Sequence, residues 1–151
     1  MKTCFFIGHH NVPETVRPLL DAAVERHITE YGVTRFIVGH YGAFDRMAAS
    51  AVIRAKAKYS GSTLLLLLPY HPAERKIPLD EGFDGSYYPE GMEKVPRRFA
   101  IVRANEYVIR HICDYLITYD CYIATKTHDF VKIARIREAK GGLSVENIAE
   151  T

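Results

Sequence analysis

Residues 36–49, "FIVGHYGAFDRMAA", join an apolar run to an amphipathic one. The apolar run ends at Gly39, a second glycine follows at Gly42, and a helical pattern opens at Phe44 with Asp45 in its first turn. These features predict a strand that turns directly into a helix. The turn either holds a phosphorylated ligand or only connects two elements, with Asp45 as a capping residue.

Short apolar runs and longer amphipathic segments alternate along the rest of the chain. We expect strands over 3–8, 34–39, 63–69, 114–120 and 143–149, and helices over 13–32, 43–59, 97–112 and 127–140. Apolar strands separated by helices indicate a mostly parallel sheet of about five strands with helices on both faces. The sequence therefore predicts a single three-layer, Rossmann-like α/β domain over residues 1–151, with a loop-rich insert at about 69–96.

The charge balance excludes several classes of partner. The chain has 20 Lys and Arg against 18 Asp and Glu, a formal net charge of +2, and its basic residues are scattered. We therefore expect neither nucleic acid nor an anionic membrane as a partner. The run "LLLLLP" at 64–69 is too short to cross a bilayer, and the apolar run near the start is too short for a signal peptide.

The cysteines indicate a reducing environment. Cys4, Cys113 and Cys121 form no CxxC pair, and the first two lie in or beside apolar segments, as buried free thiols do. The expected location is the cytoplasm. We expect no cysteine nucleophile, because no oriented histidine partner is evident for Cys121.

Ligands of parallel sheets bind beyond the carboxyl ends of the strands, where the strand order reverses. The segments that meet at this edge are Gly8-His9-His10, Gly39-His40-Tyr41-Gly42, Pro69-Tyr70-His71 and Tyr119-Asp120-Cys121. A helix N-terminus after Gly42 favours phosphate, and the glycines allow close backbone approach. The Asp45 carboxylate can accept hydrogen bonds from ribose hydroxyls. The plainer alternative, in which the glycines only form the turn, stays open.

Three segments in this order resemble the SLOG superfamily, more narrowly its DUF1273 or YpsA-like branch, which is related to Lonely Guy and DprA-type domains. They are "CFFIGHH" at the first strand end, "FIVGHYGAFDRMAA" at the second and "RANEYVIRHICDYLITY" before the fourth strand. The resemblance implies a Rossmann-like fold and a pocket for a nucleotide or a metabolite derived from NAD or ADP-ribose. The ligand-binding positions implied are Gly8, His9, His10, Gly39, His40, Gly42, Asp45, Arg103 and Asn105.

The chain also departs from the family. His10 stands where relatives have an arginine, and His40 where they have the second glycine of the turn. After the fourth strand relatives have a Gly-Gly element, whereas "CYIATKTHDFVK" contains no glycine. The Pro-Gly-Gly-x-Gly-Thr segment of the Lonely Guy phosphoribohydrolases, with a glutamate beyond it, cannot be placed either. We therefore expect a metabolite-binding sensor without catalytic residues.

Two alternatives remain open. A hydrolase or transferase acting on an N-glycosidic bond would need two carboxylates, such as Asp45 and Asp120, to converge at the edge of the sheet. A degenerate scaffold acting by self-association, for example as a homodimer, would place exposed aromatic residues such as Phe83 and Tyr87 at an interface.

Other side chains have two interpretations each. Strand-end histidines with Asp120 or Cys121 would suit zinc, but their spacing is not a metal signature, so we expect no metal and no certain cofactor. Arg103 either reaches a ligand phosphate or belongs to a salt-bridged surface stripe. Tyr87 and Tyr88 either stack on a base or pin the insert to the core.

Overall fold

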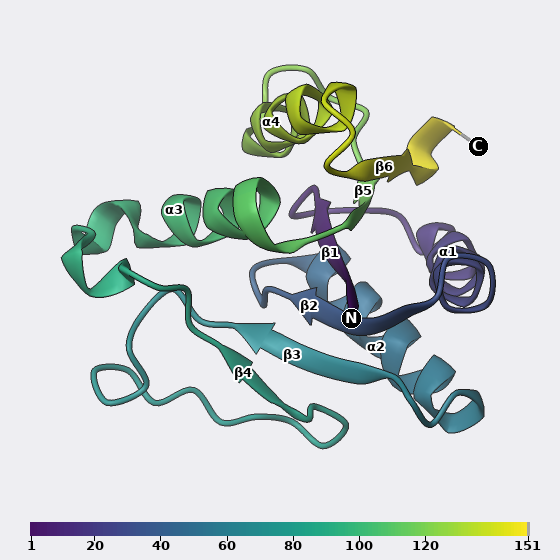
Figure 1. Cartoon of the computed structure of the whole chain (residues 1–151), viewed down its shortest axis with the longest axis horizontal. Coiled ribbons are helices and arrows are strands. Elements are labelled where there is room, and N and C mark those ends of the chain that lie inside the picture. The colour runs from purple at the N-terminus through teal and green to yellow at the C-terminus, as the bar shows by residue number, and fades with distance from the viewer. Residues whose placement is uncertain (151) are drawn as a thin grey trace.

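The computed structural model describes residues 1–150 (Figure 1). Its strands are β1 (Lys2–Gly8), β2 (Val33–Val38), β3 (Thr63–Leu67), β4 (Gly85–Tyr87), β5 (Tyr115–Tyr119) and β6 (Ser144–Asn147). Its α-helices are α1 (Val16–Thr29), α2 (Ala43–Lys58), α3 (Ala100–Tyr107) and α4 (Lys126–Ala139). Short helical turns lie at Met92–Lys94, Arg97–Phe99, Val108–Ile112 and Ile148–Glu150. Every strand and helix expected from the sequence is present, and β4 is an addition.

The six strands form one sheet in the order β4-β3-β2-β1-β5-β6, and every pairing is parallel. This confirms the predicted Rossmann-like α/β fold, with one strand more than expected. The extra strand, β4, lies inside the insert and pairs with Leu65–Leu67 of β3. Gly85-Ser86-Tyr87 has no apolar run, so sequence periodicity could not predict a strand there. Its pairing with β3 covers an edge that would otherwise be free.

Helices cover both faces of the sheet (Figure 1). α1 and α2 pack on one face, in the same core as Phe36 of β2, and α3 and α4 pack on the other, in the same core as Ile37. Neighbouring residues of one strand thus enter opposite cores, as the pleat requires. Burial on both faces explains why the central strands are almost continuously apolar. No helix within residues 1–150 is long and apolar enough to cross a membrane.

The strand order reverses beside β1. The chain proceeds from β1 through β2 and β3 on one side, and returns through α3 to place β5 and β6 on the other side. The helices that follow β1 and β5 therefore lie on opposite faces, which leaves a crevice at the carboxyl ends of the central strands.

Candidate binding cavity at the carboxyl edge

A cavity of about 200 Å³ lies at the carboxyl edge of the sheet. Its walls come from the ends of β1, β2 and β3, from α3 and from the beginning of α4. The lining residues are Ile7, Gly8, His10, Gly39, Tyr41, Asp45, Leu67, Pro69, Ile101, Ala104, Asn105, Lys126, Thr127 and Phe130. The structure thus brings Gly8, His10, Gly39, Asp45 and Asn105 of the predicted binding residues to one cavity.

The turn between β2 and α2 depends on Gly42. Its φ is 119°, in the region that favours glycine, and a Cβ at this position would lie 2.8 Å from His10 Nδ1 and 2.9 Å from His10 Cα. The next residue, Ala43, donates its N–H to the His10 carbonyl at 2.7 Å. The segment after β1 and the turn after β2 are therefore held together by main-chain contact.

Gly8 and Gly39 are required by neighbouring side chains. A Cβ at Gly8 would lie 2.2 Å from the ring of Phe44, which is fully buried in the core. A Cβ at Gly39 would lie 2.9 Å from Asp45 Oδ2. Packing within the protein is thus sufficient to explain why Gly8 and Gly39 are glycines. Their presence does not by itself require a ligand.

Asp45 occupies the first turn of α2 and faces the cavity. Its Oδ2 accepts the N–H of Tyr41 at 3.0 Å, which closes the turn. Burial raises the pKa of Asp45 to about 7, while the Tyr41 amide and Arg46 lower it less strongly. The carboxyl group is thus close to half protonated at neutral pH, and it can donate or accept a hydrogen bond.

The N-terminus of α4 forms the opposite wall. Thr125 caps the helix, its Oγ1 accepting the His128 N–H at 3.2 Å, and its carbonyl accepts the Asp129 N–H at 3.2 Å. The N–H groups of Lys126 and Thr127 have no acceptor within residues 1–150. Free amides at a helix N-terminus attract anions, and the Lys126 side chain adds a positive charge.

The sequence did not identify Lys126 and Thr127 as binding residues. The segment before this helix lacks the Gly-Gly element of the resembled family, yet the structure places the first turn of the helix at the cavity. The available signal was Thr125 before a helical pattern, since threonine is a favoured N-cap. Phe130 was also missed, and nothing local distinguishes it from an ordinary core residue. Tyr41 and Pro69 belong to the strand-end segments that the sequence placed at this edge.

Asn105 and Arg103 lie in different environments although both belong to α3. Asn105 lines the cavity, and its Nδ2 donates to the Ile101 carbonyl one turn earlier at 3.0 Å. Arg103 is exposed and is not among the residues that line the cavity. This position gives no support to a phosphate contact. The alternative of a salt-bridged surface stripe is met only in that Arg103 lies at the surface, since no ion pair joins it to an acidic side chain among residues 1–150.

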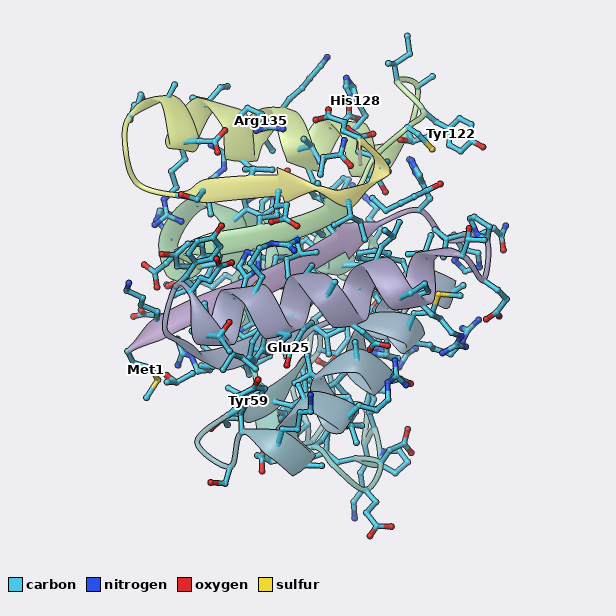
Figure 2. All side chains as sticks on the ribbon, turned by 90° about the vertical axis from the view of Figure 1, so that its right-hand side faces the viewer. Met1, Glu25, Tyr59, Tyr122, His128 and Arg135 are labelled. Carbon is cyan, nitrogen blue, oxygen red and sulfur yellow. The ribbon has the colours of Figure 1, made fainter. Side chains whose placement is uncertain are left out.

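His9 belongs to a separate polar cluster beside β5. Its Nε2 accepts the Cys121 N–H at 3.0 Å and lies 3.9 Å from Asp120 Oδ1, while Asp120 Oδ2 lies 2.8 Å from His128 Nδ1. Burial lowers the pKa of His9, against an opposing effect of Asp120. Since Nε2 is an acceptor, the neutral ring carries its proton on Nδ1. Figure 2 shows His128 on α4 and Tyr122 on the loop that precedes this helix. The ring centroid of Tyr122 lies 4.9 Å from that of His9.

His40 lies on the other side of the turn and lines a second hollow of about 320 Å³, between α2 and residues 77–83 of the insert. Its Nδ1 is buried and has no hydrogen-bond partner within the described part of the chain. Burial lowers the pKa of His40, and the nearby charge of Arg75 lowers it further. The ring packs 4.2 Å from that of Tyr41, measured between centroids.

The strand-end histidines do not gather into a metal site. Among residues 1–150 there is no group of three His, Cys, Asp or Glu side chains able to hold a metal ion. Asp45 and Asp120 do not share the cavity either, because Asp120 lines a different hollow with His128. The convergence that the N-glycosidase alternative requires is therefore not observed for Asp45 and Asp120. Lys126 and His128 line different hollows, so the first turn of α4 separates the end of β5 from the cavity.

Neither a family model nor a curated protein sequence matches this chain. The resemblance to the SLOG superfamily therefore stays a prediction. The functional proposal below rests on the geometry and charge of the cavity.

Proposed function

We propose that this protein binds a nucleotide, or a metabolite derived from NAD or ADP-ribose, and acts as a sensor of the SLOG type. One observation carries the proposal: the cavity beside the strand-order reversal combines the free amides and the charge of Lys126 on one wall with Asp45 on the other. The three free cysteines support a reducing compartment, such as the cytoplasm, as its place of action.

Each wall has a distinct part in the proposal. A phosphate group accepts hydrogen bonds from the N–H groups of Lys126 and Thr127, and the helix dipole and the ammonium group neutralise its charge. A ribose hydroxyl forms a hydrogen bond with the carboxyl group of Asp45. This group can donate or accept the hydrogen bond near neutral pH, because burial raises its pKa to about 7. The apolar side chains of Ile101 and Phe130 close the space between these polar groups.

We propose binding without a chemical step. Cleavage of an N-glycosidic bond in the usual two-carboxylate manner needs a second acidic group near Asp45. Within the described residues, Asp45 is the sole acidic side chain among those that line the cavity. The homodimer remains a secondary proposal, supported by the exposed side chains of Tyr122, Ile123 and Ile136. Phe83 and Tyr87, the aromatic residues expected at such an interface, are instead only partly exposed and pack against the core.

A thermal-shift screen tests the binding proposal. The purified protein is heated with AMP, ADP, ADP-ribose or NAD, and a ligand at 100 times its Kd is expected to add about 2.7 kcal/mol of stability. For a chain of this length that corresponds to a rise in Tm of about 5–10 °C. Lys126→Ala is expected to weaken binding at least about tenfold, since it removes the cation facing the ligand phosphate.

Arg103→Ala is the matched control, because it removes an exposed positive charge that lies outside the cavity. Its binding should equal that of the unmodified protein. A screen in which no compound raises the Tm would contradict the proposal. Equal loss of binding in the Lys126 and Arg103 variants would show that only general charge attraction was being measured.

A further inference from the structure

A hollow of about 420 Å³ lies between α4 and the end of β6, and none of the described residues that line it also lines the cavity. We call it the α4–β6 hollow. Its lining residues are Asp120, His128, Val131, Lys132, Arg135, Ile136, Asn147 and Glu150. Any chemistry of these side chains is therefore separate from binding in the cavity.

The carboxylate of Asp120 is buried and held in one place. Its side chain is 7% exposed. Asn147 of β6 fixes the main chain of Asp120, since its Oδ1 accepts the Asp120 N–H at 3.1 Å and its Nδ2 donates to the Asp120 carbonyl at 2.9 Å. Among the described residues, the carboxylate has a hydrogen bond only with His128, whose Nδ1 lies 2.8 Å from Oδ2. The other oxygen, Oδ1, is buried and has no such partner within residues 1–150.

This hydrogen bond fixes the tautomer of His128. An ionised carboxylate only accepts hydrogen bonds, so a neutral His128 carries its proton on Nδ1. His9 cannot serve Asp120 in the same way, because its Nε2 already accepts the Cys121 N–H. The lone pair of His128 is therefore on Nε2. This nitrogen has no partner within residues 1–150 and is not among their buried unpartnered atoms, so it is open to solvent.

In the described chain, His128 is the one histidine that combines a solvent-accessible ring with a carboxylate on Nδ1. The rings of His9 and His71 each use a nitrogen to accept a backbone N–H. No ion pair or hydrogen bond within residues 1–150 joins a carboxylate to the other four, which are His10, His27, His40 and His111. A carboxylate on Nδ1 holds the ring in one orientation and stabilises the positive charge that forms when Nε2 reacts.

Two cations line the same hollow. Lys132 follows His128 by four residues, so their side chains lie on one face of α4. Lys132 is exposed, and no ion pair joins it to an acidic side chain among residues 1–150. Arg135, which Figure 2 shows on the same helix as His128, is already paired with Glu138 at 2.8 Å. Lys132 is therefore the cation that is available to an anion beside His128.

The hollow also contains a second carboxylate. Glu150 is exposed, and its Oε1 lies 3.4 Å from Asn147 Nδ2. Both acidic groups of the hollow thus have a polar partner of their own, Asp120 in His128 and Glu150 in Asn147. Their contacts leave the charge of Lys132 unpaired.

We propose that His128 is a phosphoryl-accepting histidine, with Asp120 as its positioning residue and Lys132 as the cation that attracts the phosphoryl donor. The donor class is a small phosphorylated compound with a good leaving group, such as an acyl phosphate or a phosphoramidate. This inference goes beyond the proposed function and does not depend on the ligand of the cavity.

The step is a substitution at phosphorus. The lone pair of His128 Nε2 forms the N–P bond while the bond from phosphorus to the leaving group breaks, and the leaving group departs with that electron pair. With phosphoramidate the leaving group takes a proton from water and departs as ammonia. The proton on Nδ1 stays in its hydrogen bond to Asp120, whose charge balances that of the phosphorylated ring.

The test uses phosphoramidate as the donor and the full chain as the acceptor. Tandem mass spectrometry of peptides taken at successive times measures the phosphoryl group on each histidine. We expect His128 to react at least about tenfold faster than the exposed His111. Asp120→Asn should slow the reaction at His128 at least about tenfold, because an amide can donate to Nδ1 and so hold the ring proton on Nε2.

Asp129→Asn is the matched control for Asp120. It makes the same exchange at an exposed residue of α4 that does not line the hollow, and it should change the rate at His128 by less than about twofold. Heteronuclear NMR of the histidine rings adds a measurement that needs no variant. In the unmodified protein the proton of neutral His128 should be on Nδ1.

The choice of a phosphoryl donor is tested through the cation. Lys132→Ala should slow phosphorylation of His128 at least about threefold, because the ammonium group no longer attracts the anionic donor. It should not slow the reaction of His128 with diethyl pyrocarbonate, which is an uncharged electrophile. Lys140→Ala removes an exposed lysine just after α4 that does not line the hollow, and it should change neither rate.

Several results would overturn the proposal. Equal rates at His128 and His111, or a ring proton on Nε2 of His128, would show that Asp120 does not prepare the ring for attack. Equal slowing by Asp120→Asn and Asp129→Asn, with Tm values that show both variants to be folded, would exclude Asp120 as the positioning residue. If Lys132→Ala slows both reagents equally or neither, the hollow does not select a phosphoryl donor. Each of these results leaves the binding proposal for the cavity intact.

Discussion

Near neutral pH the carboxyl group of Asp45 exists in two protonation states, because burial raises its pKa from an ordinary value of 3.8 to about 7. The folded protein therefore holds this proton more tightly than the unfolded chain does. The contribution of this group to the free energy of unfolding is therefore largest below about pH 4, its pKa in the unfolded chain. This contribution is lost as the pH rises through about 7, its pKa in the folded protein. A group that destabilises the fold at working pH is typical of a functional position.

Replacement of Asp45 by asparagine should remove this pH dependence. The side-chain oxygen of Asn still accepts the Tyr41 N–H, but it has no charge to desolvate. We expect Asp45→Asn to be more stable than the unmodified protein, by about 2 kcal/mol more at pH 8 than at pH 5. Urea unfolding at the two pH values measures this, and an equal gain at both would show that the Asp45 pKa is not raised.

Gly42 has a purely steric role at the same turn. Gly42→Ala should lower the free energy of unfolding by about 2–4 kcal/mol, since the residue has a φ of 119° and its Cβ would press against His10. Gly61→Ala is the control, because a Cβ there meets nothing within 4 Å and its φ is not positive. Thermal denaturation compares them, and equal Tm values would refute the steric account.

At the scale of elements, the end of the helical segment before β5 depends on a side chain from α4. Arg137 Nη1 donates to the carbonyls of Ile109 at 2.8 Å and Cys113 at 2.6 Å, which are left free where the π-helical turn Val108–Ile112 ends. Carbonyls at helix ends need such partners when water has limited access. α4 therefore supports the segment that leads into β5, in addition to forming a wall of the cavity.

Removal of this side chain should loosen the connection between α3 and β5. Arg137→Ala leaves two partly buried carbonyls without their donor, at an expected loss of about 2–3 kcal/mol of stability. Arg135→Ala is a suitable control on the same helix, since Arg135 forms an exposed ion pair with Glu138 and its removal should cost less than about 1 kcal/mol. Amide hydrogen exchange in residues 108–113 should accelerate in the first variant only. Unchanged exchange there would show that Arg137 is dispensable.

At the scale of the whole molecule, histidines buried in different places contribute to one pH profile. Burial lowers the pKa of His9, His27 and His40 from their ordinary value of 6.5. Groups of this kind bind protons more readily in the unfolded chain. Their contribution to stability is complete above pH 6.5 and is lost as the pH falls below it. The effect is opposite in direction to that of Asp45.

The two effects can be separated in one series of measurements. In the Asp45→Asn background only the histidine effect remains near neutrality, so the free energy of unfolding should rise from pH 5 to about pH 7 and then level off. The unmodified protein should have a flatter curve over the same range, because Asp45 offsets the gain. Guanidinium melts at several pH values give both curves. Identical curves would contradict the opposing assignments.

Part of the site was predictable from local sequence. Gly39, Gly42 and Asp45 were predicted to form a strand-to-helix turn, and the structure has that turn at the carboxyl edge of the sheet. The family resemblance grouped His9 and His40 with these residues, but the structure places His9 beside Cys121 and His40 on the second hollow. The direction of a side chain after a strand end depends on which loop lies next to it.

By itself the sequence determined the elements with a local cause. Its apolar runs and amphipathic periods specify β1, β2, β3, β5, β6 and the helices, because burial of each strand or helix follows its own repeat. The unbroken apolar character of the central strands specifies a sheet that is covered on both faces. The tertiary structure alone decided that β4 pairs with β3, that Lys126 lines the same cavity as Asp45, and that burial raises the pKa of the Asp45 carboxyl. These features depend on residues distant in the chain becoming neighbours, and on the water excluded between them, for which no local pattern exists.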